Sequence, residues 1–293
     1  MLEPLKPDHR FFAQYRYAIV DAERREEIPD NWPVAPVAPA FLKSDTARCP
    51  LLVDCAGIPD AERYCLLDRL EAETETKEES FVSLALASQE NFKALQRHLA
   101  ERLVIRHSVD KQPRQFRYYD PGTFIQLPDI LGDAGMSWLL GPIEAVAIPR
   151  FGEWRSLRNP GKADHRGFDI RRFADPLQAF SVVNRVLTQL PEACDQPAWC
   201  NKAIETRRIV EHARTTYGLD QRDDLVAFAL HAWRWHPVFD RHPTIQKLLT
   251  ELSKAGPEDE LDYREITARL DEADWQKIAQ DLTAAANQQG TMQ

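Results

Sequence analysis

The pattern of apolar residues changes once along this chain, and that change limits the fold more than any other feature of the sequence. Up to about residue 155, short apolar runs such as Arg16–Asp21 (RYAIVD) and Pro50–Asp54 (PLLVD) alternate with segments of helical periodicity. From Asp175 onward, apolar residues recur only at helical spacing. Alternating strands and helices favour a sheet flanked by helices, and a purely helical remainder favours a separate lobe. The sequence therefore predicts an α+β domain with a mixed sheet, followed by an all-α lobe.

Between the two parts, the composition changes over Arg150–Phe173. This segment holds seven Arg or Lys residues against three acidic residues, and four aromatic residues are interleaved with them. One interpretation is a solvated linker whose aromatic side chains lie on both domains, and the other is a strip that contacts an anion or a partner. We therefore expect an α/β domain over residues 1–155, a basic, aromatic-rich linker over 156–174 and a helical domain over 175–293.

Charge and composition exclude several classes of protein. The net charge of −9 argues against a general nucleic-acid binder and against binding to an anionic membrane. No apolar run approaches the roughly 18 residues of a membrane-spanning helix, and the N-terminus lacks the apolar core of a secretory signal. Five cysteines without regular spacing suggest reduced thiols. We expect a cytoplasmic protein with no nucleic-acid and no membrane partner.

Two segments carry local predictions that the structure can test. Helix Asp60–Leu70 is followed by an acidic run, Glu71–Glu79, which is typical of a solvated loop. Ser88 is placed to cap the helix that carries the apolar stripe from Phe92 to Leu103.

The stretch from Pro113 to Pro128 (PRQFRYYDPGTFIQLP) predicts a strand, a turn and a short helix. Its strand, Gln115–Tyr119, is expected to pair as a hairpin with Leu103–His107 and to alternate its side chains between two faces. Asp120 before Pro121 is a helix-start signal, because a carboxylate can accept from free N–H groups and proline suits the first turn.

Neither a metal nor a cofactor is predicted. His231, His236 and His242 are separated by five and six residues, whereas metal ligands that share a helix face lie three or four apart. Cys194 and Cys200 lack the two-residue gap of a zinc knuckle or a redox pair.

One arrangement leaves an enzyme open as an alternative. Asp21, Asp54 and Asp120 each end a predicted strand, and three carboxylates at one edge of a sheet could bind a metal or do acid–base work. Asp is also an ordinary turn residue at strand ends, and the chain contains no nucleophile elbow, phosphate-binding loop or dinucleotide fingerprint. No catalytic residue is assigned.

The order of these signals resembles one family, over roughly residues 15–155. YAIVD, PLLVD, FVSLALASQENFKALQRHLAERLVIR and Phe116–Pro121 (FRYYDP), followed by Gly141-Pro142, are similar to the type VI secretion effector-adaptor, or effector-chaperone, domain, long catalogued as a domain of unknown function. That family commonly reads F-R-F-Y-D-P-R, so Gly122 departs from it where Arg is usual.

The resemblance implies a non-enzymatic bacterial cytosolic protein that binds a toxin effector and helps to load it onto the VgrG spike protein. An immunity-type inhibitor that blocks a toxin, and less plausibly an Asp-based hydrolase, are the alternatives. A carrier needs a partner surface with aromatic and Arg anchors. The candidate partner-binding residues are Arg117, Tyr119, Asp120, Trp154, Arg155, Arg158, Phe168, Trp233, Trp235 and Phe239.

Overall fold

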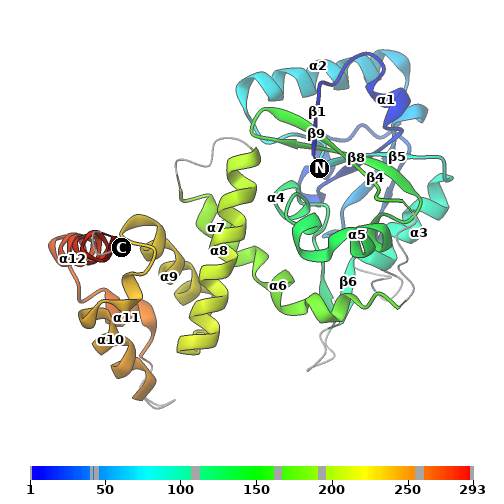
Figure 1. Ribbon diagram of the computed structural model, residues 1–293. Coiled ribbons are helices and arrows are strands. Elements are labelled where there is room, and N and C mark those ends of the chain that lie inside the picture. The colour runs from blue at the N-terminus through cyan, green and yellow to red at the C-terminus, as the bar shows by residue number, and fades with distance from the viewer. Residues whose placement is uncertain are drawn as a thin grey trace. The chain divides into compact units, whose positions relative to one another are not determined.

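The chain folds into two compact units in a computed structural model (Figure 1). The structure describes residues 2–39, 42, 46–106, 113–161, 167–190, 196–254 and 261–290. Unit 1 comprises residues 1–177 together with 194–200, and unit 2 comprises residues 178–193 together with 201–293. The fold class is as predicted, with a sheet and helices in the N-terminal part and a helical C-terminal part.

A seven-stranded sheet forms the centre of unit 1, in the order β1-β9-β8-β5-β2-β4-β3. Its strands are β1 (Glu3–Leu5), β2 (Tyr17–Val20), β3 (Val34–Pro36), β4 (Leu51–Asp54), β5 (Leu84–Ser88), β8 (Ile143–Arg150) and β9 (Glu153–Arg158). Every neighbouring pair is antiparallel, so the expected mixed sheet is wrong in this respect. The chain does run in the same direction in β4 and β5, but β2 lies between them and no parallel pair forms.

Helices cover the sheet on both faces, which explains why its central strands read as continuous apolar runs (Figure 1). Ala18 and Val20 of β2 join a core cluster with α1 (Phe11–Gln14) and α2 (Asp60–Thr76). Tyr17, on the opposite face of β2, contacts Phe92 of α3 (Phe92–Arg102). The short helix α4 (Pro121–Phe124) and α5 (Leu127–Leu140) follow before β8.

The acidic run after Leu70 is a helix and not the predicted loop. Helix α2 continues to Thr76, where Lys77 ends it in the left-handed conformation with φ of 59°. Glu73 is buried in this last part and its carboxylate accepts a hydrogen bond from the backbone N–H of Phe81 at 2.9 Å. A buried acceptor for an otherwise unpaired N–H outweighs the charge repulsion within the run. The cap of α3 is Asn91, since Ser88 is the last residue of β5.

The stretch around residue 117 also differs from its prediction. Strand β6 (Val104–Arg106) pairs with β7 (Pro113–Gln115) in a separate two-stranded sheet, so the strand ends four residues before Tyr119. Phe116, Tyr118 and Tyr119 are all buried, so their side chains do not alternate between a buried and an exposed face. The predicted helix start is confirmed, because the Asp120 carboxylate accepts from the N–H of Thr123 at 2.6 Å.

The expected linker over 156–174 begins inside the sheet. Strand β9 pairs with both β8 and β1, and the 3₁₀ helix η3 (Ile170–Phe173) follows within unit 1, which extends to Leu177. A two-residue turn, Phe151-Gly152, joins β8 to β9 with φ of 58° and 72°, and this left-handed pair matches the twist of a tight hairpin. Because the chain reverses at this turn, the first part of the basic segment pairs with β8 as strand β9 and does not form a linker.

Unit 2 is helical. It contains α7 (Phe180–Leu187), most of α8 (Gln196–Tyr217), α9 (Arg222–Arg234), η4 (Phe239–Arg241), α10 (Pro243–Lys254), α11 (Tyr263–Thr267) and α12 (Glu272–Gly290), and α6 (Ala174–Gln178) precedes it. Gly218, with φ of 68°, follows the last residue of α8, where the left-handed conformation favours glycine. The last part of the chain forms two helices, α11 and α12, and Asp271 caps α12 by accepting from the N–H of Asp274 at 2.9 Å.

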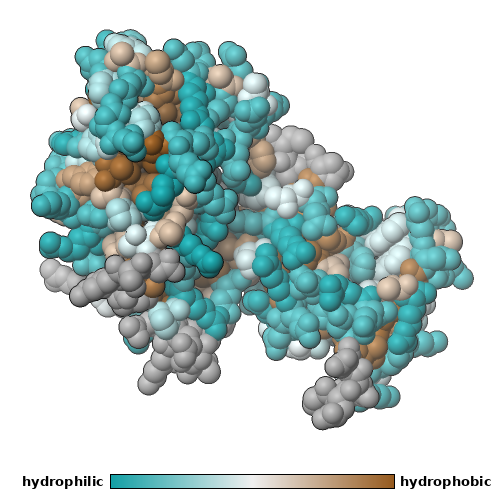
Figure 2. Space-filling view, turned by 180° about the vertical axis from the view of Figure 1, so that it is seen from behind, coloured by the Kyte–Doolittle hydropathy of each residue, from teal (hydrophilic) through white to brown (hydrophobic). Residues whose placement is uncertain are grey.

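Hydrophilic residues cover most of the face seen in Figure 2, and hydrophobic residues reach it in separate patches. Within the described parts of the chain, no helix combines the length and the apolar character that crossing a membrane requires.

Candidate functional site

The three aspartates that sequence reasoning brought together do not form one cluster, because Asp54 lies apart from Asp21. In the register of β2 and β4, Tyr17 faces Asp54 and Val20 faces Leu51, so Asp21 and Asp54 follow opposite ends of the paired strands. Asp54 accepts two hydrogen bonds from the Arg16 guanidinium, at 3.1 and 2.8 Å. The expected cluster of carboxylates is therefore wrong, because it assumed parallel strands. No group of three potential metal ligands occurs among the residues that the structure describes.

Arg117, Tyr119 and Asp120 have three different environments. Arg117 is half exposed and its Nη2 donates to Oδ2 of Asp21 at 2.9 Å, which joins the turn after β7 to the 3₁₀ helix η1 (Ala22–Glu27). Tyr119 is buried, and this burial raises the pKa of its phenol to about 12. Asp120 is the cap of α4. Of the three residues, Arg117 is exposed, Asp120 is partly exposed and Tyr119 is buried.

The Arg150 guanidinium lies against the α-carbon of Gly122. A Cβ atom at residue 122 would come within 2.8 Å of Nη1 of Arg150. The same guanidinium carbon lies 4.0 Å from the ring centroid of Trp199 and 4.7 Å from that of Phe151. Burial lowers the pKa of Arg150, and the charges of Asp120 and Glu79 act in the opposite direction. Glycine at residue 122 thus makes room for a buried cation next to the start of α4.

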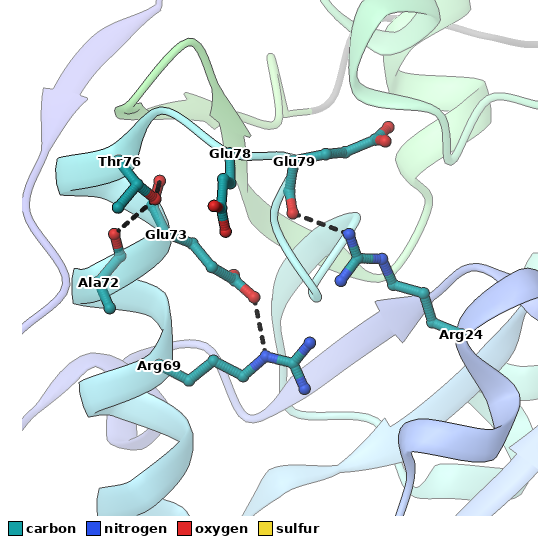
Figure 3. Close-up of a pocket in the computed structure, with 7 residues that line it drawn as sticks. All are labelled: Arg24, Arg69, Ala72, Glu73, Thr76, Glu78 and Glu79. Carbon is teal, nitrogen blue, oxygen red and sulfur yellow. Dashed lines mark hydrogen bonds and ion pairs between the residues drawn. The ribbon is translucent and has the colours of Figure 1, made fainter.

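A cavity of about 490 Å³ opens on unit 1 beside η1 and the last turns of α2 (Figure 3). Its lining residues are Arg24, Arg69, Ala72, Glu73, Thr76, Glu78 and Glu79. The side chains of Arg24 and Arg69 enter it from opposite sides, the carboxylates of Glu73 and Glu78 lie between them, and the Glu79 carboxylate points away (Figure 3). We call this the charged cavity.

Internal ion pairs fix the floor of the charged cavity. Nε of Arg69 donates to Glu73 at 2.8 Å and its Nη2 pairs with Glu27, while its guanidinium carbon lies 4.2 Å from the ring centroid of Phe81. Arg24 donates to the backbone oxygen of Glu79 at 2.9 Å. Because these cations are held by neighbours, they keep their positions and still present donor groups to the cavity.

Chemically, the charged cavity offers guanidinium donors beside carboxylate acceptors. Such a lining can satisfy both the N–H and the C=O groups of a peptide segment and its charged side chains. Its seven lining residues include no cysteine, serine or histidine that could act as a nucleophile or as the general base that activates one. Sequence reasoning missed this site because it placed Glu73 in a loop. The Arg69–Glu73 spacing is a helical ion-pair signal that a longer predicted helix would have revealed.

The predicted partner residues near β9 divide between core and surface. Trp154 is only 3% exposed and packs on Phe11, which favours a core role over contact with a partner. Arg155 donates to Glu153 on its own strand, and the 81%-exposed side chain of Arg158 lies 4.0 Å from Glu3. Half-buried Phe168 stacks on Phe173, in contact with Trp138.

In unit 2 the predicted residues also divide. Phe239 is fully buried against Phe228, so the structure favours a core role for it. Trp233 is half buried and donates from Nε1 to Thr206 at 2.9 Å. Trp235 is half buried and stacks on Trp275, with centroids 6.0 Å apart and planes at 8°.

The three histidines of unit 2 contact different groups. His231 is hydrogen-bonded to Tyr263, His236 accepts from the N–H of Val238, and His242 lies 3.5 Å from Asp281. Cys194 lies outside the described residues, and Cys200 contacts the backbone oxygen of Ile125.

A family model described as a domain of unknown function (DUF4123) matches residues 16–135. This range contains every lining residue of the charged cavity as well as Arg117, Tyr119 and Asp120. It ends within α5, before β8, β9 and all of unit 2. A search of curated proteins found no match, and neither did a search of solved structures.

Proposed function

We propose that this protein is a bacterial cytoplasmic adaptor that binds a type VI secretion toxin effector and presents it to the VgrG spike protein. It acts by binding and not by catalysis. The proposal depends mainly on one observation: the residues that match the domain of unknown function include both the FRYYDP motif and the lining of the charged cavity. The motif is one of the segments that resemble effector adaptors.

The position of Arg150 supports this resemblance where the sequence departs from it. Effector-adaptor domains commonly carry Arg at the position of Gly122, and here a guanidinium from β8 lies against Gly122 itself. A cation thus occupies the neighbourhood of Asp120 although residue 122 has no side chain. At this place in the chain a positive charge therefore comes from β8 and not from residue 122.

The charged cavity supports a protein partner. Its size suits one or two side chains of an extended segment, and its fixed donors and acceptors are the complement of peptide groups. Both edge strands of the large sheet carry proline, Pro4 in β1 and Pro36 in β3, and each proline lacks the N–H that strand addition would use. These features favour capture of the effector by side chains at the charged cavity over capture at a sheet edge.

Co-purification tests the proposal. The tagged full-length chain is recovered from its native bacterium, and the proteins that remain bound are identified by mass spectrometry. The proposal expects a toxin-like protein together with VgrG. A toxin recovered alone and inactive in the complex would instead identify an immunity-type inhibitor, and the absence of any protein partner would overturn both.

A matched pair of variants links the result to the site. Arg24→Glu reverses a charge inside the charged cavity, and Arg10→Glu makes the same change at an exposed position outside the matched range. We expect Arg24→Glu to lower effector recovery by about tenfold or more, because losing one partner of a recognised charge pair costs several kcal/mol. Arg10→Glu should leave recovery unchanged. Equal losses in both variants would show that the effector binds elsewhere.

A further inference from the structure

A second pocket, of about 290 Å³, lies in unit 2, outside the range that the family model matches. It is formed by α9, α11 and the start of α12, and sequence reasoning assigned no function to this place. The lining residues are Ala227, His231, Arg264, Thr267, Ala268, Leu270 and Trp275. We call it the aromatic pocket.

His231 gives the aromatic pocket a neutral polar group. Its Nδ1 is 2.8 Å from the hydroxyl oxygen of Tyr263, and its ring centroid is 4.3 Å from that of Trp275. Burial, together with the charge of Arg234, lowers the pKa of His231 to about 4, so the imidazole is uncharged at pH 7. Its Nε2 has no hydrogen-bond partner within the described parts of the chain. A ligand can therefore pack on this ring without meeting a charge.

Apart from Arg264 and Thr267, the remaining lining residues are apolar. Trp275 is buried, and its ring contacts both His231 and Trp235, which lie one turn apart at the end of α9. Ala227 and Ala268 are small, so they leave space, and Leu270 adds an aliphatic wall. Such a lining, with few polar groups, suits one Leu or Phe side chain.

The rim of the aromatic pocket is acidic. Arg264 is the basic residue of the lining, and three aspartates surround its guanidinium, with Asp262 at 2.9 Å, Asp224 at 3.5 Å and Asp223 at 3.6 Å. The neighbouring Arg269 pairs with Glu251 at 2.6 Å. Between the lining residues Leu270 and Trp275 the chain carries the exposed side chains of Asp271, Glu272 and Asp274. An excess of carboxylates around an apolar pocket favours a ligand whose apolar anchor is flanked by basic residues.

We infer that the aromatic pocket binds one Leu or Phe side chain of a partner segment that carries Lys or Arg on both sides of this anchor. The inference rests on the proposed function in one respect, because it takes the toxin effector as the source of that segment. It adds a second contact to the one at the charged cavity, and the two differ in chemistry. Binding at two sites would raise the overall affinity without requiring either contact to be strong.

The direct test uses peptides and the full-length chain at pH 7. The probe is a short peptide of lysine and alanine with one central phenylalanine, compared with the same peptide carrying alanine at the centre and with one carrying glutamate in place of lysine. Binding is followed by NMR through the side-chain signals of His231 and Trp275. We expect the phenylalanine–lysine peptide to shift these signals and each altered peptide to bind at least about tenfold more weakly. Equal binding by the alanine-centred peptide, or no shift at these two residues, would overturn the inference.

A matched pair of variants locates the binding. Ala268→Trp places a large ring in the aromatic pocket from an exposed position, and Ala285→Trp makes the same change on an exposed part of α12. The first should weaken binding of the phenylalanine–lysine peptide by at least about tenfold, and the second should leave it unchanged. Unchanged binding in Ala268→Trp would show that the peptide contacts another surface.

The same variants separate this inference from the proposed function. If the wild-type chain recovers effector and VgrG but Ala268→Trp recovers them equally well, the adaptor function stands and the contact at the aromatic pocket fails. If the phenylalanine–lysine peptide binds as expected while no effector is recovered, the pocket stands and the adaptor function fails.

Discussion

The charged cavity of unit 1 and the aromatic pocket of unit 2 differ in the charge of the polar group that each presents to a ligand. In the charged cavity, Arg69 keeps its charge because Glu27 and Glu73 compensate it. In the aromatic pocket, His231 loses its charge because burial favours the neutral imidazole. The first site depends on ion pairs that must all be present, and the second depends on packing and on pH. Each of the changes below alters one side of this comparison.

The largest effect is expected from Glu73→Ala. The buried carboxylate accepts from both Arg69 and the N–H of Phe81, so its removal leaves two donors without their partner. We expect the free energy of unfolding of unit 1 to fall by about 3 kcal/mol. Urea denaturation measures it, with Glu75→Ala, at an exposed position on the same helix, as the control. A loss no larger than that of the control would mean that the floor of the charged cavity is not held by Glu73.

Gly152→Ala tests the close contact between the turn that joins β8 to β9 and the end of α2, which lines the charged cavity. Gly152 has φ of 72°, and a Cβ there would lie 2.6 Å from the backbone oxygen of Thr74, in the last turns of α2. We expect a loss of about 2 kcal/mol beyond that of Gly167→Ala, because Gly167 has a similar φ of 79° but a Cβ there meets no atom of the described residues within 4 Å. Thermal unfolding of both variants measures the difference. Equal losses would assign the whole effect to backbone strain.

The aromatic pocket should respond to pH. The pKa of His231 is about 4 in the folded chain and near 6.5 in the unfolded chain, so the unfolded state binds the additional proton as pH falls. The stability of unit 2 is therefore complete above about pH 6.5 and should decrease by about 2 kcal/mol between pH 7 and pH 5. Denaturant unfolding followed by hydrogen exchange in α9 and α11 measures this.

A control separates His231 from the other titrating groups. In His231→Phe the decrease between pH 7 and pH 5 should be smaller by about the same 2 kcal/mol, because no imidazole remains to be protonated there. An unchanged decrease would assign the pH dependence to other groups.

The smallest effect on stability is expected at the surface pair Arg117–Asp21. Both partners are partly exposed, so their coupling in a double-mutant cycle of Arg117→Ala and Asp21→Ala should be about 0.5 kcal/mol. Thermal unfolding of the four proteins gives this value. A coupling of several kcal/mol would place the pair among the structural contacts that hold unit 1, and not among its surface contacts.

The sequence by itself determined the elements whose signals are local. Strands β2 and β4 follow from apolar runs, α8 ends at Gly218, and Asp120 caps α4, because each depends on a few neighbouring residues. The division into a part with strands and a helical part also follows from periodicity alone. The role of the FRYYDP motif in binding a partner stays a prediction.

Tertiary structure alone decided which residues meet. Asp21 and Asp54 separate because β2 and β4 are antiparallel, and Arg24 and Arg69 converge because η1 and α2 line the same cavity. Glu73 becomes a buried acceptor only because Phe81 presents an N–H to it from across a turn. Periodicity specifies which face of an element is apolar, whereas strand order and long-range hydrogen bonds decide what that face contacts. Both binding sites are built from contacts of this second kind.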